Sequence, residues 1–167
     1  MHELAITVIG PDRPSIVANV AEALAGVGAN LTDSTMTRLR GHFTMTLICN
    51  GPSLVEAREA LSPLEDVVIE VREVAPESDK KDNGEPYVVS VHGADRLGIV
   101  AAVTRVVAVA GGNITDLSTR LSGTLYVLIA EVDLPGGAAD ELAEQLAVAA
   151  AELGVEVTLR RAESELL

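Results

Sequence analysis

The chain has 167 residues and a net charge of −13, from 25 acidic and 12 basic residues, so its surface repels the phosphates of DNA and RNA. Hydrophobic residues are 48% of the chain, which indicates a folded protein, and no apolar run reaches the roughly 20 residues that cross a bilayer. Met1-His2-Glu3 does not open a secretory signal, and Cys49 has no second cysteine to pair with. We therefore expect a cytoplasmic protein without membrane or direct nucleic-acid partners.

The first half of the chain predicts the order strand, helix, strand, strand, helix, strand. A tight hairpin is expected at Arg40-Gly41, and Ser53 and Glu56 have the spacing of a capping box. The predicted elements are a strand at 4–9, a turn at 10–14, a helix that stops at Gly28, strands at 31–39 and 43–48, a helix from Ser53 and a strand at 67–71.

A polar segment bracketed by prolines, residues 76–86, has the composition of a linker. It divides the chain into a first domain at 1–75 and a second at 87–167. The second half predicts a strand at 87–92, a helix at 98–110, strands at 114–121 and 124–132, a helix through Leu142, Leu146 and Leu153, and a strand at 155–159.

An internal repeat underlies this symmetry. Residues 10–33 and 93–116 align without a gap, with 12 of 24 positions identical. After a one-residue deletion in the second copy, Thr37-Arg38-Leu39 aligns with Thr119-Arg120-Leu121, and Gly41 with Gly123.

The repeated order βαββαβ predicts an α+β fold: two ferredoxin-like domains, each an antiparallel sheet with both helices on one face. The other sheet face and the sheet edges need covering by another domain or chain. We therefore expect close pairing of domains and a homodimer.

The repeated turns are the candidate site. Gly10 and Gly93 are expected to end the first strand of each copy, and the helix that follows offers unpaired backbone amides that attract a carboxylate. Asp12 and Asp95 can balance an ammonium group. Across the sheet, two asparagines that open the second strands can read both charged groups of an amino acid, Asn30 and Asn113.

Structural roles are open for the same residues. Asp12 and Asp95 can cap helices, and the two asparagines can serve a left-handed or turn position. Arg13 and Arg96 can be solvated or can form salt bridges to a neighbouring unit.

The sequence contains little that indicates an enzyme. His2, His42 and His92 share no metal-ligand spacing, Cys49 is expected to be a small buried residue, and no glycine loop for phosphate precedes a helix. We expect no catalytic residues, no metal and no cofactor.

The GxDRxxIV turn and the N-[LI]-T-D that follows it resemble ACT domains in tandem, and Asn30–Ser34 with Gly41–Thr44 is similar to the glycine cleavage system transcriptional repressor group. The resemblance covers nearly the whole chain. It implies that a small amino acid, such as glycine or serine, binds where domains pair. The family turn often contains D-R-P-G, whereas Ser15 replaces the glycine in copy one and Leu97 replaces the proline in copy two, so the two sites need not be equivalent.

The implied binding residues lie in the turns and at the start of the second strands. They are Asp12, Arg13, Ser15, Ile16, Asn30 and Leu31 in copy one, and Asp95, Arg96, Leu97, Gly98, Ile99, Asn113 and Ile114 in copy two.

Three functions compete. The first is a regulator that senses an amino acid and acts on a partner enzyme or transcription factor, as the resemblance implies. The second is a protein-interaction module with a degenerate ligand site. The third is an acylphosphatase-type enzyme, which shares the strand order, but Asp12 beside Arg13 would repel an acyl phosphate.

Overall fold

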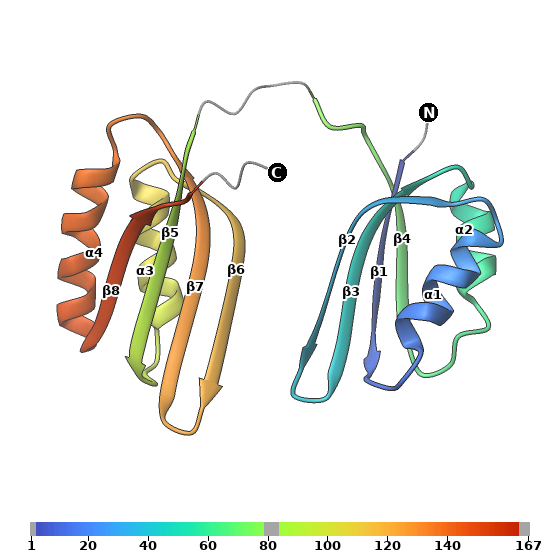
Figure 1. Cartoon of the computed structure of the whole chain (residues 1–167), viewed down its shortest axis with the longest axis horizontal. Helices are drawn as coiled ribbons and strands as arrows, with labels where there is room; N and C mark the ends of the chain where they lie inside the picture. Colours follow the sequence, from blue (N-terminus) through green and yellow to red (C-terminus); the bar gives the residue numbers. More distant parts are fainter. Residues whose placement is uncertain (1–2, 79–83, 164–167) are drawn as a thin grey trace. The chain divides into compact units, whose positions relative to one another are not determined.

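The computed structural model describes residues 3–78 and 84–163, and the chain divides into two compact units, 1–79 and 80–167 (Figure 1). The N-terminal unit consists of β1 (Glu3–Pro11), α1 (Ile16–Ala25), β2 (Asn30–Leu39), β3 (His42–Asn50), α2 (Leu54–Leu61) and β4 (Val68–Val74). The C-terminal unit consists of β5 (Glu85–Ala94), α3 (Ile99–Val109), β6 (Asn113–Ser122), β7 (Leu125–Leu134), α4 (Ala139–Leu153) and β8 (Val155–Arg161).

Each unit is a four-stranded antiparallel sheet, with strand orders β2-β3-β1-β4 and β6-β7-β5-β8. Both helices of a unit cover the same face of its sheet (Figure 1). The predicted α+β class and the ferredoxin-like βαββαβ order are confirmed.

The core of each unit follows from the two periodicities in its sequence. Leu4, Ile6 and Val8 of β1 alternate toward the helices and are fully buried. From α1, Ile16, Val20 and Leu24 recur every four residues and complete the same cluster. The helix stripes predicted from sequence therefore face the sheets.

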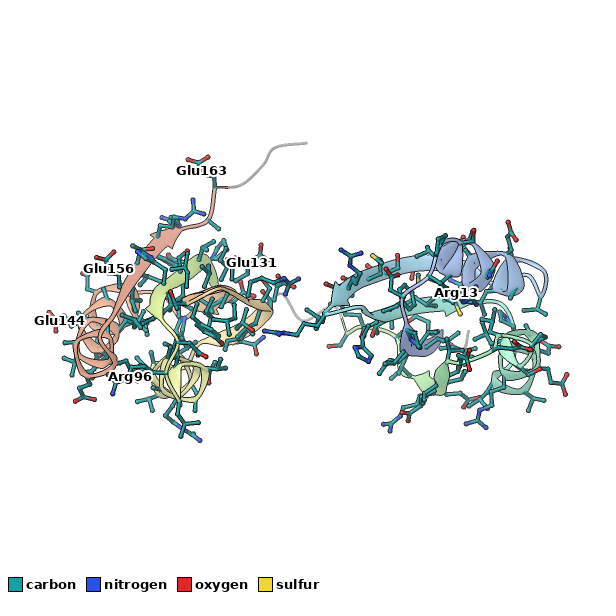
Figure 2. All side chains as sticks on the ribbon, turned by 90° about the horizontal axis from the view of Figure 1, so that it is seen from below. Arg13, Arg96, Glu131, Glu144, Glu156 and Glu163 are labelled. Atoms are coloured by element: carbon teal, nitrogen blue, oxygen red, sulfur yellow. The ribbon has the colours of Figure 1, made fainter. Side chains whose placement is uncertain are left out.

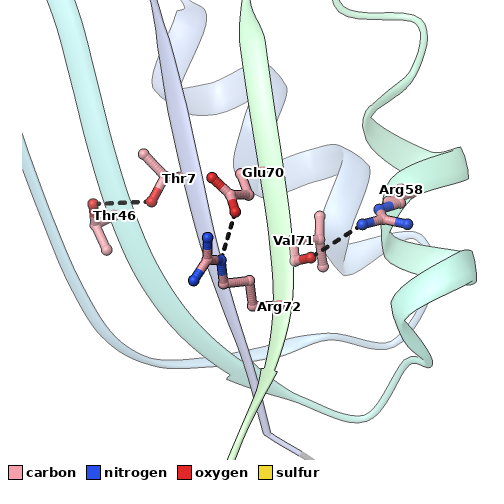
Figure 3. A network of polar contacts seen from close by, with 6 residues as sticks. All are labelled: Thr7, Thr46, Arg58, Glu70, Val71 and Arg72. Atoms are coloured by element: carbon pink, nitrogen blue, oxygen red, sulfur yellow. Dashed lines mark hydrogen bonds and ion pairs between the residues drawn. The ribbon is translucent and has the colours of Figure 1, made fainter.

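The face of the first sheet opposite its helices carries polar side chains. Figure 3 shows the hydroxyls of Thr7 and Thr46 in contact across β1 and β3, and Glu70 paired with Arg72 along β4. On the edge strand β4, the guanidinium of Arg58 in α2 donates to the carbonyl of Val71 at 3.4 Å.

The predicted hairpin at Arg40-Gly41 and the predicted capping box of Ser53 and Glu56 are both confirmed. Arg40 and Gly41 join β2 to β3 with φ of 48° and 80°, as a type I′ hairpin requires. Ser53 Oγ accepts from the amide of Glu56 at 3.2 Å, and the Glu56 carboxylate accepts from the amide of Ser53 at 2.9 Å. Helix α1 ends at Ala25, three residues before the predicted stop at Gly28.

The predicted one-residue deletion in the second copy is wrong. Phe43 pairs with Gly10 and Arg38, and Tyr126 pairs with Gly93 and Leu121. Arg38 is thus the structural counterpart of Leu121, one residue away from the position that the sequence alignment gave it. A slip of one residue turns a strand side chain to the other face of its sheet.

The start of the C-terminal unit lies close to the predicted boundary. β5 begins at Glu85, so Glu85 and Pro86, assigned to the linker at 76–86, are the first residues of a strand. Residues 79–83 of that segment lie outside the described residues. The domain limits at 1–75 and 87–167 stay a prediction.

Candidate functional site

Each unit has one corner at which its first strand leads into its first helix. We name residues 10–18 the first corner and residues 93–101 the second corner. The strands continue past the glycines, to Pro11 and Ala94, so the expectation that Gly10 and Gly93 end them is wrong. These glycines allow close packing: a Cβ at Gly10 would lie 2.6 Å from the carbonyl oxygen of Asp66, and one at Gly93 would lie 2.9 Å from a methyl of Val155.

The helices begin on left-handed residues rather than on capping side chains. Ser15 has φ of 70° and Gly98 has φ of 90°, and neither position provides a side-chain cap to its helix. Asp12 and Asp95 lie three residues before these cap positions, so their interpretation as helix caps is wrong.

Backbone amides are open at both helix starts. The amide of Ala102 bonds the carbonyl of Gly98 at 2.9 Å, but within residues 3–78 and 84–163 the amides of Val100 and Ala101 have no acceptor. The same holds for Val17 and Ala18 at the start of α1. Unpaired amides at a helix N-terminus, together with the helix dipole, favour an anionic group.

The second corner forms an open pocket of about 590 Å³, which is within the range of small-molecule sites. Leu97 is fully exposed there. The lining residues are Asp95, Arg96, Leu97, Gly98, Ile99, Val100, Ala101 and Tyr126. Five predicted site residues, from Asp95 to Ile99, are therefore brought together around one cavity.

Arg96 has a structural partner at this corner. Its Nη1 donates to the carbonyl of Leu153 at 2.9 Å and lies 3.4 Å from that of Glu152, at the C-terminal end of α4 (Figure 2). Neither predicted role, solvation or a salt bridge to a neighbouring unit, describes this contact. The guanidinium thus connects the second corner to α4, and the contact is favourable because a helix C-terminus attracts a cation.

The first corner uses its acidic residue differently. The carboxylate of Asp12 lies 3.6 Å from Nη1 of Arg38, and the Asp12 amide donates to the carbonyl of Gly41 at 2.9 Å. The side chain of Arg13 is exposed and makes no hydrogen bond or ion pair within the described part of the chain, whereas its backbone carbonyl accepts from the amide of Ile16 at 3.4 Å. Ile16 is buried in the core below the corner.

The asparagines lie far from the corners of their own units. Asn30 and Glu3 both pair with Asn50 at one end of the sheet, whereas the first corner lies at the other end, where Pro11 ends β1. At about 3.3 Å per residue, the length of β1 separates them by roughly 26 Å. Asn113 is likewise in register with Asp133, at the Pro86 end of β5.

The residues around these asparagines have other roles. Neither asparagine has a positive φ, so the left-handed interpretation is wrong; Gly28 and Gly111 hold that conformation instead. Leu31 and Ile114 are half-buried and pack against the cores. Asn113 lines a separate cavity of about 340 Å³.

Sequence reasoning missed Tyr126, Val100 and Ala101. The tyrosine comes from β7, where it pairs with Gly93 of β5. An aromatic in the strand that pairs with the corner glycine was the available signal, because Phe43 occupies the same position opposite Gly10.

Other reactive groups lie elsewhere. Cys49 is fully buried in β3, as expected, and burial raises the pKa of its thiol. No group of three or more potential metal ligands occurs within residues 3–78 and 84–163. His2 lies outside the described residues. Within the described residues, every helix is too short or too polar to cross a membrane.

Fold and corners together define a tandem pair of ferredoxin-like units with matching strand-to-helix corners. The chain belongs to the ACT domain family, which matches residues 2–71 and 85–160.

The chain is also similar to three kinds of known protein. A UPF0237 protein of Methanocaldococcus jannaschii is 40% identical over 75 residues, which are 44% of this chain and 83% of that protein. The crystal structure of an unknown protein from Galdieria sulphuraria has a TM-score of 0.83 at 30% identity and covers 97% of this chain and 99% of its own.

The third similarity is to the glycine cleavage system transcriptional repressor. The Escherichia coli protein is 36% identical over 50 residues, 30% of this chain and 26% of its own length. A crystal structure with the same description, marked putative, has a TM-score of 0.72 at 22% identity and covers 98% of both chains. This chain is therefore an ACT-domain protein related to that repressor.

Proposed function

We propose that this protein is a regulator without catalytic activity, which binds a free amino acid and thereby changes its affinity for a partner enzyme or transcription factor. The observation that carries the proposal is the second-corner pocket, where open amides and a carboxylate lie around one cavity. Coupling between such a site and a partner is typically about 1–3 kcal/mol.

The charges of the pocket suit an α-amino acid. The ligand carboxylate accepts from the amides of Val100 and Ala101, and its ammonium group pairs with the carboxylate of Asp95. Asp95 suits this role because it makes no ion pair within the described residues, unlike Asp12.

The two asparagines can contact a bound ligand only if the ligand lies in the corner of another domain. Asn30 and Asn113 lie at the far ends of their own sheets, so contact with a ligand in a corner requires a corner from another unit or another chain. We therefore retain the homodimer and the cytoplasmic location as parts of the proposal. In their own sheets β2 and β6 are edge strands, the kind of strand at which domains or chains commonly pair.

Glycine and serine are the first ligands to test. The name of the related repressor connects that protein to glycine cleavage and to transcription. The net charge of −13 supports action through a protein partner rather than directly on DNA.

A thermal unfolding screen of the full chain against the twenty amino acids at millimolar concentration tests the proposal. A ligand at one hundred times its Kd stabilises the chain by about 2.7 kcal/mol. Asp95→Asn is expected to remove about half of this shift, as a roughly 10-fold loss of affinity implies. Glu144→Gln, an acid-to-amide change at an exposed position of α4, preserves it. Absence of a shift with every amino acid contradicts ligand sensing.

The interaction module with a degenerate site remains a second candidate. It is favoured by the contact of Arg96 with α4 and by the pairing of Asp12 with Arg38, because both corner side chains are engaged within their own unit. In that case a partner co-purifies without any added amino acid, and Asn30→Ala and Asn113→Ala leave its binding unchanged.

A further inference from the structure

The second-corner pocket exposes apolar surface that a ligand composed of charged groups alone would not use. Leu97 is fully exposed and Val100 is 37% exposed, and both line the cavity beside Ile99 and Ala101. Apolar surface of this kind gains roughly 25 cal/mol per Å² when it is removed from water. The walls of the pocket therefore favour a ligand with an apolar part.

The first corner differs at the positions that give the second its character. Pro14 occupies the position of Leu97, and Ser15 that of Gly98. Phe43 is fully buried, whereas its counterpart Tyr126 is half-buried and lines the pocket. The hydroxyl of Tyr126 makes no hydrogen bond within residues 3–78 and 84–163 and is available to a ligand.

We propose that the second-corner pocket selects an α-amino acid with an aliphatic side chain, such as leucine or valine, over glycine and serine, and that Leu97 determines this selectivity. The inference rests on the proposed function, whose polar contacts hold the carboxylate and ammonium groups. The aliphatic side chain then lies against Leu97 and Val100, and the hydroxyl of Tyr126 donates to the ligand carboxylate.

The division of roles predicts which variants change selectivity. Leu97 contacts only the ligand side chain, so its loss weakens leucine and leaves glycine unaffected. Tyr126 contacts the group that all amino acids share, so Tyr126→Phe weakens every ligand by a similar factor. One additional methylene in an apolar pocket is worth 10-fold or more.

The test measures Kd values for leucine, valine, serine and glycine by titration calorimetry on the full chain. The unmodified protein is expected to bind leucine at least 10-fold tighter than glycine. Leu97→Ser is expected to weaken leucine about 5-fold or more, without weakening glycine. Because Leu97 is fully exposed, this substitution removes no core contact.

Val109→Ser is the matched control. Val109 is 80% exposed at the other end of α3 and does not line the pocket, so this variant is expected to leave all four Kd values unchanged.

Three outcomes overturn the inference. If glycine or serine binds as tightly as leucine, the selectivity is refuted while the proposed function stands. If leucine is preferred but Leu97→Ser behaves like Val109→Ser, the assignment of Leu97 is refuted. If none of the twenty amino acids binds, the proposed function fails together with the inference.

Discussion

The first and second corners share their Asp-Arg pair and their Ile-Val-Ala start of helix, yet they engage these groups differently. In the first corner, Asp12 is paired with Arg38, and the corner arginine, Arg13, has an exposed side chain. In the second corner, Asp95 lines a pocket and the arginine, Arg96, is bound to α4. Identical side chains at equivalent backbone positions therefore have opposite availability to a ligand.

The difference originates outside the repeated motif. The partner of Asp12 is Arg38, whose counterpart in the second unit is Leu121, which cannot form an ion pair. Neighbouring strands and helices thus decide what each copy of the motif can bind. Substitutions made in parallel at both corners measure this division directly.

The largest expected loss of stability follows from substitution of the closely packed corner glycines, Gly10 and Gly93. Gly10→Ala is expected to lower the free energy of unfolding by about 3 kcal/mol, because the new Cβ meets the backbone oxygen of Asp66, which has little freedom to move. Gly93→Ala is expected to cost less, about 2 kcal/mol, because its closest contact is a side-chain methyl of Val155 at 2.9 Å rather than a backbone oxygen at 2.6 Å. Urea unfolding measures both, and a larger loss for Gly93→Ala would contradict the packing described for the corners.

The arginines give the next effect. Arg96→Ala is expected to destabilise the C-terminal unit by about 1 kcal/mol, because two carbonyls at the end of α4 lose a charged donor. Arg13→Ala is expected to stay within about 0.5 kcal/mol. Faster amide hydrogen exchange at the end of α4 in Arg96→Ala alone supports the contact; equal exchange in both variants refutes it.

Local chemistry explains what the sequence could predict. The alternation of Leu4, Ile6 and Val8, the Ser53–Glu56 capping box and the Arg40-Gly41 hairpin each depend on residues within a few positions of one another. The repeat placed both corners correctly because it needs no gap between residues 10–33 and 93–116.

The errors concern contacts made across the fold. Arg96 meets Leu153, 57 residues away, and nothing in the repeated motif indicates that partner. The distance from Asn30 to the first corner was implied by the predicted topology itself: β1 and β2 both pair antiparallel with β3, so they run parallel and begin at the same end. The chemistry of an asparagine side chain alone does not specify its distance from the corner; its position along β2 does.

A reciprocal exchange at the helix starts compares the corners at the backbone level. Ser15→Gly is expected to stabilise the N-terminal unit by about 1 kcal/mol, because Ser15 holds a left-handed φ of 70° that glycine adopts more easily. Gly98→Ser is expected to destabilise the C-terminal unit by a similar amount, although a Cβ there meets no atom within 4 Å. The free energies of unfolding of both variants test whether the left-handed backbone at these two positions is the source of the strain. If both substitutions change the free energy of unfolding in the same direction, this explanation is contradicted.

The smallest changes in stability are expected for the two corner aspartates, Asp12 and Asp95, which are expected to differ in ligand binding instead. Asp12→Asn is expected to cost about 0.5 kcal/mol, since the Arg38 side chain is 68% exposed and that of Asp12 is 30% exposed, and this loss is expected to shrink at high salt. Asp95→Asn is expected to leave unfolding unchanged but to weaken amino-acid binding about 10-fold, because the ligand ammonium loses its counter-ion. Titration calorimetry with both variants decides the matter: if Asp12→Asn weakens binding as much as Asp95→Asn does, the first corner is a ligand site of equal standing, despite its internal ion pair.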